Sequence, residues 1–122
     1  LPASRQETTV MRIVRDTQQS RAVKVLYDYC CQVCGIRLTG SAGPYAEAAH
    51  IRPLGAPHNG PDTLNNLLCL CANHHVLFDY GGFAIADDFT LLNIEGQLMV
   101  KPGHDIDVAY IRYHRSHYYI GI

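Results

Sequence analysis

Residues 65–79 read NNLLCLCANHHVLFD, and the fold is best predicted from this segment. Residues 67–70 are a short apolar run, which predicts a buried β-strand. Residues 72–80 predict a helix, because Gly81-Gly82 supplies the residue type that commonly ends one. A strand therefore leads directly into a helix. Their junction carries a dense set of metal-binding side chains, namely Cys71, His74 and His75.

A second pair of soft metal ligands lies upstream, at Cys31-x-x-Cys34. A two-residue gap within a tight turn brings both sulfur atoms within reach of one metal ion, and Gly35 permits that turn. Cys71 and His74 repeat the spacing at the strand-to-helix junction. The two pairs predict a four-ligand Cys₃His site for structural Zn²⁺, with no open coordination position. The alternative is a chance pair of cysteines beside cysteines of the core.

Composition limits the class of protein and its surroundings. The chain has 122 residues, enough for one domain with a modest core, or for part of something larger. Its five cysteines do not form the even, widely spaced framework of secreted disulfide proteins, so we expect a reducing, cytoplasmic location, with Cys30 and Cys69 as small buried residues. The net charge of −1 gives no global basic field, and no apolar run reaches membrane-spanning length. Basic residues gather within 5–37 and 112–117, which fits either phosphate contacts or ordinary solvated helix faces.

The helix after the junction predicts a second metal site of a different kind. His75 follows His74 by about 100° of helical rotation, so the two imidazoles cannot easily bind one ion. His75 and Asp79 are i and i+4 and therefore share a helix face. An imidazole with a carboxylate suits a divalent ion such as Mg²⁺ or Mn²⁺, with water completing the shell. Taken alone, the pair is better explained as an ordinary helix histidine beside a surface acid.

A third histidine, His50, lies on a strand predicted over residues 45–51, which ends before Pro53. A loop rich in proline and glycine, residues 52–64, then leads to Asn66 and back to the strand and helix already described. A lone histidine in an apolar strand is more often structural than catalytic. The order of strand, loop, strand and metal-bearing helix shifts that balance toward catalysis.

Three segments of the chain resemble a known family. They are Ala48-Ala49-His50-Ile51-Arg52-Pro53, Asn65-Asn66-Leu67-Leu68 and Cys71-Ala72-Asn73-His74-His75. Together they resemble the HNH endonuclease signature, over about residues 27–86. The resemblance implies a ββα-metal fold and metal-dependent hydrolysis of DNA phosphodiesters. It also implies site roles: His50 as the general base, Asn66 as the residue that fixes the loop carrying it, and His75 and Asp79 as ligands of the catalytic metal.

Two positions depart from the pattern of this family. Many members have an acidic or histidine ligand just before the first histidine, where this chain has Ala49. Glu47 lies on the same strand face as Ala49 and is a candidate to reach the metal instead. The second zinc half-site is Cys-x-x-His rather than Cys-x-x-Cys, and histidine remains an acceptable zinc ligand.

The remaining segments predict further elements around this core. In chain order these are a helical segment over 5–30 broken near 15–20, a loop over 40–44, a hairpin of 83–86 with 90–94, a third strand at 98–101, and a last helix capped by Asp105 or Asp107. On that helix, Ile106, Tyr110 and Tyr113 are expected to share one face. The predicted fold is α+β, in one domain over 1–122. Its ββα-metal (His-Me finger) core with structural zinc covers about 31–82, flanked by N- and C-terminal helices and a small β-hairpin.

The sequence therefore favours a metal-dependent DNA endonuclease with one catalytic metal and a histidine general base. No segment is identifiable as a base-reading helix, so we expect the catalytic domain of a restriction-type enzyme, covalently linked to a target-reading domain absent from this chain. Relatives with such a nuclease half include restriction enzymes that act on modified DNA, and a homodimer would account for double-strand cleavage. The alternative is a non-catalytic, zinc-bearing module that binds nucleic acid.

Overall fold

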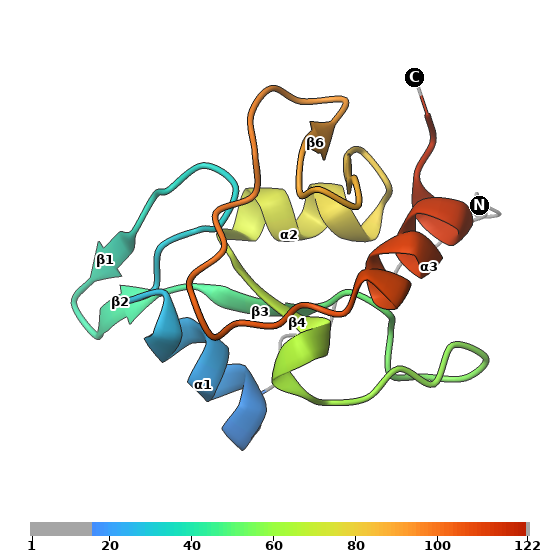
Figure 1. Cartoon of the computed structure of the whole chain (residues 1–122). Coiled ribbons are helices and arrows are strands. Elements are labelled where there is room, and N and C mark those ends of the chain that lie inside the picture. The colour runs from blue at the N-terminus through green and yellow to red at the C-terminus, as the bar shows by residue number, and fades with distance from the viewer. Residues whose placement is uncertain (1–15, 122) are drawn as a thin grey trace, which may run out of the picture.

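Two short paired strands, β3 and β4, lie at the centre of the molecule, with a helix on each side (Figure 1). The computed structural model describes residues 16–121. Its elements in chain order are α1 (Gln18–Leu26), β1 (Leu38–Gly40), β2 (Gly43–Tyr45), β3 (Glu47–His50), the 3₁₀ helix η2 (Leu64–Asn66), β4 (Leu67–Leu70), α2 (Ala72–Asp79), β5 (Ala84–Ile85), β6 (Leu91–Leu92) and α3 (Val108–Tyr118). This mixture of helices and antiparallel strands confirms the predicted α+β class. Among the described helices, none is both long and apolar enough to cross a membrane.

The predicted strand before the junction is β4, and it pairs antiparallel with β3 so that His50 lies opposite Leu67. Side chains of a strand point alternately to its two faces. Ala49 therefore packs in the same cluster as Phe78 of α2, whereas Ala48 packs with Val23 of α1. Figure 1 shows α2 above this strand pair and α1 below it. The two helices thus bury both faces of a ribbon that would not be stable by itself.

The first helix is shorter than the segment 5–30 that was predicted as helical. Thr17 and Ser20 cap its start reciprocally: the Thr17 hydroxyl accepts from the Ser20 N–H at 3.1 Å, and the Ser20 hydroxyl accepts from the Thr17 N–H at 2.8 Å. The helix ends where Asp28 and Tyr29 take left-handed conformations, with φ of 50° and 62°. This turn leads the chain into the first cysteine pair. The part of the predicted segment before residue 16 lies outside the described residues.

Residues 40–44, predicted as a loop, belong to a hairpin. β1 and β2 pair antiparallel, with Leu38 opposite Tyr45 and Gly40 opposite Gly43. The single strand predicted over 45–51 is therefore divided between β2 and β3. Both hairpin strands are largely exposed, so no alternation of apolar and polar residues marks them in the sequence.

The hairpin predicted near the C-terminal third is present as β5 with β6, but the third strand expected at 98–101 is wrong. After a single bridge of Gln97 with Thr90, the chain turns away. The Met99 N–H then donates to the carbonyl of Gln32 at 2.8 Å, and the Gln32 side-chain amide donates to the carbonyl of Met99 at 2.7 Å. The segment therefore braces the first cysteine pair, a long-range contact that no local pattern shows.

The last helix, α3, is capped by Asp107, whose carboxylate accepts an N–H of the first turn at 2.9 Å. The predicted apolar face is wrong, because Ile106 precedes the helix and the buried residues of α3 are Ile111 and His114. The ring of His114 stacks on Phe78 of α2, with centroids 3.7 Å apart. Burial lowers the pKa of His114 to about 4, so this histidine is neutral and belongs to the core.

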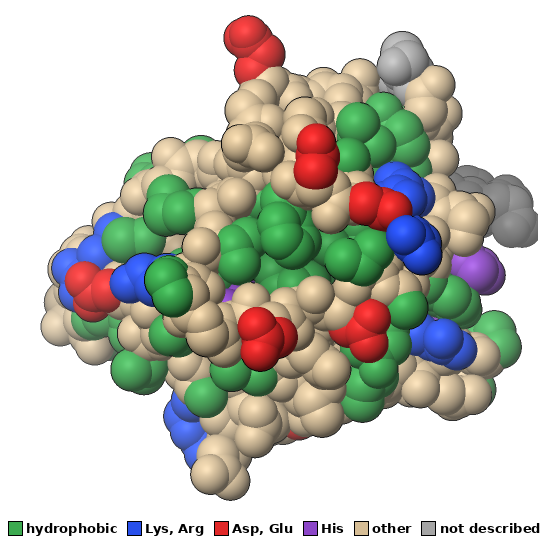
Figure 2. All heavy atoms as spheres, viewed as in Figure 1, with side chains coloured by type: hydrophobic (Ala, Val, Ile, Leu, Met, Phe, Trp, Pro, Cys, Tyr) green, Lys and Arg blue, Asp and Glu red, His purple; other side chains and the backbone are tan. Residues whose placement is uncertain are grey.

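Charged side chains on the face shown in Figure 2 form small mixed groups rather than one basic patch. Arg112 and Arg115 both contact the Asp87 carboxylate, at 2.7 and 2.8 Å. Arg37 lies 3.6 Å from Asp28. For these basic residues the structure favours solvated faces over dedicated phosphate contacts. The basic residues before position 16 lie outside the described part of the chain.

Candidate metal centre and active site

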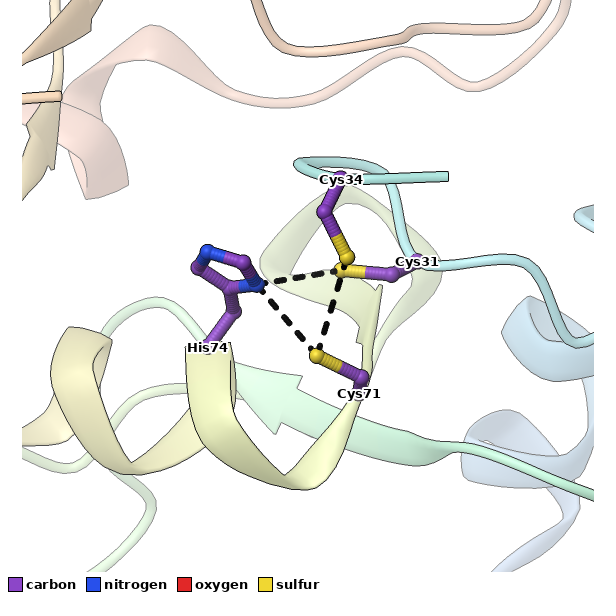
Figure 3. Close-up of side chains that lie close together, drawn as sticks. All are labelled: Cys31, Cys34, Cys71 and His74. Carbon is purple, nitrogen blue, oxygen red and sulfur yellow. Dashed lines mark hydrogen bonds between the residues drawn. The ribbon is translucent and has the colours of Figure 1, made fainter. Parts of the chain in front are cut away.

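Four ligand side chains converge at the strand-to-helix junction (Figure 3). They are the predicted zinc ligands Cys31, Cys34, Cys71 and His74, whose donor atoms all lie within 4.8 Å of one another. The Sγ atoms of Cys34 and Cys71 are 3.9 Å apart, and Nδ1 of His74 lies 3.3 Å from Cys71 Sγ. Ligands of a tetrahedral ion with bonds of about 2.0–2.3 Å are separated by roughly 3.5–3.8 Å. The cluster therefore fits one tetrahedral metal ion at its centre.

The local backbone explains why these ligands converge. The Gly35 N–H donates to the carbonyl of Cys31 at 2.8 Å, and Gly35 has a φ of +78°, which closes the tight turn. The Val33 N–H points at Cys31 Sγ, 3.4 Å away. On the other side, Cys71 is the N-cap of α2, and the first helical turn brings His74 back beside it.

The electrostatics of the cluster suit cation binding. Desolvation raises the pKa of Cys34 to about 11, and the neighbouring Cys31 and Cys71 thiols add to the increase. Desolvation also lowers the pKa of His74, which favours the neutral imidazole that binds metals. Thiols must lose their protons to ligate a metal ion. Binding of a divalent cation here therefore releases protons, and its affinity increases with pH.

The two cysteines outside the cluster differ in burial. Cys69 is fully buried, as predicted, and desolvation raises the pKa of its thiol to about 12. Cys30 is only partly buried, and its thiol lies 3.7 Å from the carbonyl of Asp28. The prediction that Cys30 is buried is therefore wrong, because α1 ends early and the left-handed turn carries this residue toward the surface.

The next residue of α2 has a different set of partners. Nδ1 of His75 lies 2.8 Å from Oε1 of Glu47 on β3, and Nε2 of His75 lies 3.3 Å from Oδ2 of Asp79. The Tyr45 hydroxyl donates to the other oxygen of Glu47. Both His75 and Glu47 are buried, at 3% and 2% exposed. The structure therefore brings His75 and Asp79 together on one face of α2, while His74 belongs to the cysteine cluster.

His75 and Asp79 offer a donor pair that suits one divalent cation. Two atoms 3.3 Å apart can both lie about 2.1 Å from the same ion. A carboxylate on the far nitrogen of a ligating histidine fixes the tautomer and the ring orientation. Glu47 has this position, because it contacts Nδ1 while Asp79 lies beside Nε2. Glu47, the candidate to reach the metal in place of Ala49, contacts the His75 ring instead.

His50 is the last residue of β3, and 10% of its side chain is exposed. Its Nε2 lies 2.8 Å from Oδ1 of Asp62, in the loop that follows the strand. Asp62 was missed in the sequence, because a loop without periodicity does not show which of its side chains returns to the strand. The available signal was that Asp62 is the single acid within residues 52–64.

Asn66 closes the loop that connects His50 to Asp62. Its amide nitrogen donates to the carbonyls of Arg52 and Pro61, at 2.9 and 2.8 Å. Its amide oxygen accepts from the Arg52 N–H at 2.8 Å, and the side chain is fully buried. One amide therefore joins the two ends of the loop and places Asp62 beside His50.

The same loop is also attached to α3, by contacts with aromatic side chains of that helix. Nδ1 and Nε2 of His58 lie 2.5 Å and 2.8 Å from the hydroxyls of Tyr113 and Tyr118, respectively. The Arg52 guanidinium lies over the Tyr113 ring, 4.2 Å from its centroid, and donates from Nε to the carbonyl of His58 at 2.6 Å. No sequence pattern showed this contact, which joins segments 55 residues apart.

Comparison with known proteins adds an independent observation to this geometry. The sequence profile described as "HNH endonuclease" matches residues 31–86, a range that contains every predicted metal ligand and catalytic residue. Residues 31–86 form an HNH endonuclease domain. The family resemblance seen in the sequence is thereby confirmed, and the domain has the fold of an HNH nuclease.

A solved structure extends the likeness of this HNH domain beyond residue 86. It is described as a modification dependent TagI restriction endonuclease, and it is 48% identical to this chain with a TM-score of 0.82. The likeness covers 87% of this chain but 39% of that one. This chain thus corresponds to well under half of that restriction endonuclease. No curated protein matches the chain.

Proposed function

We propose that this chain acts as the nuclease domain of a restriction-type enzyme, hydrolysing DNA phosphodiesters with His50 as the general base. One observation carries the proposal. Within an HNH domain, a histidine held by a carboxylate and a His–Asp donor pair lie on β3 and α2, two elements that pack together. A module that only binds nucleic acid has no use for a carboxylate on each of two histidines, Asp62 on His50 and Glu47 on His75.

Zn²⁺ is the proposed ion of the Cys₃His cluster. Three thiolates and one imidazole at tetrahedral spacing are a donor set typical of structural zinc. Four protein ligands leave no position for water or substrate, so the role of the ion is to hold the turn at 31–35 against the β4–α2 junction. Reduced thiols are required for this role, which supports an intracellular location.

The proposed ligands of the catalytic cation, Mg²⁺ or Mn²⁺, are His75 and Asp79. When bound, such a cation supplies Lewis acidity and neutralises charge at the scissile phosphate. Glu47 keeps the His75 ring oriented for this purpose. Because Ala49 supplies no donor from β3, the protein offers few ligands, and water must complete the shell.

The part of His50 is to take a proton from the attacking water. A neutral imidazole accepts a proton at its unprotonated ring nitrogen, which is the capacity that a general base needs. Asn66 contributes by holding the loop ends at Arg52 and Pro61, which keeps the strand end bearing His50 in place. Positioning of this kind accounts for a large part of many enzymatic rate accelerations.

Target choice is proposed to lie in a linked domain outside this chain. The similar restriction endonuclease is more than twice as long as the matched region, and it is described as modification dependent. Modified DNA is therefore the favoured substrate class. Cleavage of both strands would need two copies of a one-metal site, so a homodimer is the proposed active form for double-strand breaks.

The test is cleavage of modified and unmodified supercoiled plasmid by the zinc-loaded chain, in Mg²⁺, Mn²⁺ or EDTA. We expect nicked or linear products with Mg²⁺ or Mn²⁺ and none with EDTA. Asp79→Ala should lose cleavage, while Asp88→Ala, which changes an exposed acid of the β5–β6 hairpin, should retain it. Cleavage that survives both EDTA and Asp79→Ala would exclude this mechanism. Metal-independent DNA binding with no cleavage in any cation would favour the non-catalytic module.

A further inference from the structure

We infer that Asp62 is a positioning residue that sets the tautomer of His50. Its carboxylate accepts the Nε2–H of the ring, so the lone pair of the neutral imidazole lies on Nδ1. Nδ1 is then the atom that receives the proton of the attacking water. The catalytic part of this inference rests on the proposed nuclease function, whereas the tautomer does not.

The contact between Asp62 and His50 is built into the loop rather than made by two mobile surface groups. Pro61, which precedes Asp62, is held through its carbonyl by the buried Asn66 amide at 2.8 Å. The Ile51 N–H, which follows His50, donates to the carbonyl of the same Asn66 at 2.9 Å. Both partners therefore lie next to backbone fixed by one residue. Asp62 has 31% of its side chain exposed, so the carboxylate keeps some solvation and carries its charge at low cost.

The other acids of the site serve a different ring. Glu47 contacts Nδ1 of His75, and Asp79 lies beside Nε2 of the same residue. Glu47 and Ala49 point to the face of β3 that packs on α2. His50 is one residue further along the strand, so its side chain leaves from the opposite face. Each histidine of the proposed site thus has its own orienting carboxylate: Glu47 for His75, and Asp62 for His50.

The chemistry follows from the two states of an imidazole. The neutral ring carries one N–H, and a carboxylate 2.8 Å from Nε2 selects the tautomer with the proton there. As the water oxygen bonds to phosphorus, its proton passes to Nδ1, the bond from phosphorus to the leaving oxygen breaks, and that oxygen takes a proton from solvent. The ring is then an imidazolium, and Asp62 stabilises its charge without taking the proton. The same division of labour orients the histidine in serine hydrolases.

The tautomer can be read directly from the ¹⁵N chemical shifts of the His50 ring in the labelled chain, at a pH at which the ring is neutral. This measurement does not require nuclease activity. We expect a protonated Nε2 and an unprotonated Nδ1. In Asp62→Ala this preference should be lost. Asp62→Asn keeps an acceptor oxygen without the charge and serves as the second variant, in case the smaller side chain disturbs the loop. Asp105→Ala, at an exposed acid of the segment before α3, should leave the His50 spectrum unchanged.

Cleavage kinetics test the functional half of the inference. Asp62→Ala should lower kcat roughly 10- to 100-fold with little change in KM, because the base is misoriented while DNA contacts remain. A proton on Nδ1 in the wild-type chain would overturn the inference whatever the activity. The expected tautomer with a full kcat in Asp62→Ala would overturn the positioning role. The expected tautomer in a chain that cleaves no DNA would instead count against the proposed function.

Discussion

Replacement of Asn66 by alanine should release both ends of the loop that connects His50 to Asp62, at Arg52 and at Pro61. Three hydrogen bonds are lost: the two from the Asn66 amide nitrogen to Arg52 and Pro61, and the one from the Arg52 N–H to the amide oxygen. At about 1 kcal/mol each, their removal lowers the free energy of unfolding by about 3 kcal/mol. For a chain of this size that is a decrease in Tm of roughly 10–15 °C. A typical domain has enough stability to remain folded after such a loss.

Urea unfolding of the zinc-loaded chain, followed by circular dichroism, measures this loss. The matched control is Asn65→Ala, which removes the same amide one position earlier, where it accepts one hydrogen bond from the Thr63 hydroxyl. We expect the control to lose less than about 1 kcal/mol, because that bond is exposed. Equal losses in the two variants would show that closure of the loop does not depend on the buried Asn66 amide.

Three further predictions follow from contacts outside the loop ends. Cys71→Ser should lower both zinc content and thermal stability, whereas Cys30→Ser should change neither. Zinc content is measured by inductively coupled plasma mass spectrometry, and a normal value in Cys71→Ser would contradict the Cys₃His site. Glu47→Ala should weaken Mn²⁺ binding by about 10- to 100-fold in calorimetry at constant zinc, and unchanged affinity would show that this acid does not orient His75. His58→Ala removes two hydrogen bonds to tyrosines of α3 and should lower the free energy of unfolding by about 1–3 kcal/mol. Hydrogen exchange should become faster both in the loop and in the last turn of α3. Faster exchange in only one of these two segments would argue against their attachment.

Local spacing predicted the parts of this molecule that depend on local geometry. The strand and helix around Cys71 follow from an apolar run and a glycine stop, and the four metal ligands follow from two short gaps in sequence. The i and i+4 spacing likewise predicted that His75 and Asp79 share a face. In each case the backbone geometry of one turn or one element is sufficient.

Contacts between segments far apart in the sequence could not be predicted from local residue spacing. Asp62 contacts His50 because the loop folds back on itself, and the hydrogen bond from Asn66 to the Pro61 carbonyl holds it in that position. Gln32 contacts Met99 after the chain has left the β5–β6 hairpin. Residues 98–101 were therefore predicted as a strand, whereas they hydrogen-bond to the turn of the first cysteine pair. The early end of α1 depends on left-handed conformations in residues that ordinarily favour other backbone regions. These features arise from tertiary packing, which overrides local preference.

Cleavage by His50→Ala tests whether His50 is the general base. The measurement is single-turnover cleavage of plasmid DNA in Mg²⁺ or Mn²⁺, with zinc content and circular dichroism recorded on the same samples. We predict that His50→Ala loses cleavage by at least about 100-fold, because general-base catalysis contributes about that much or more, while zinc content and folding equal those of the wild type. Full activity in His50→Ala would contradict the assignment of His50 as the base, and with it the account of this site.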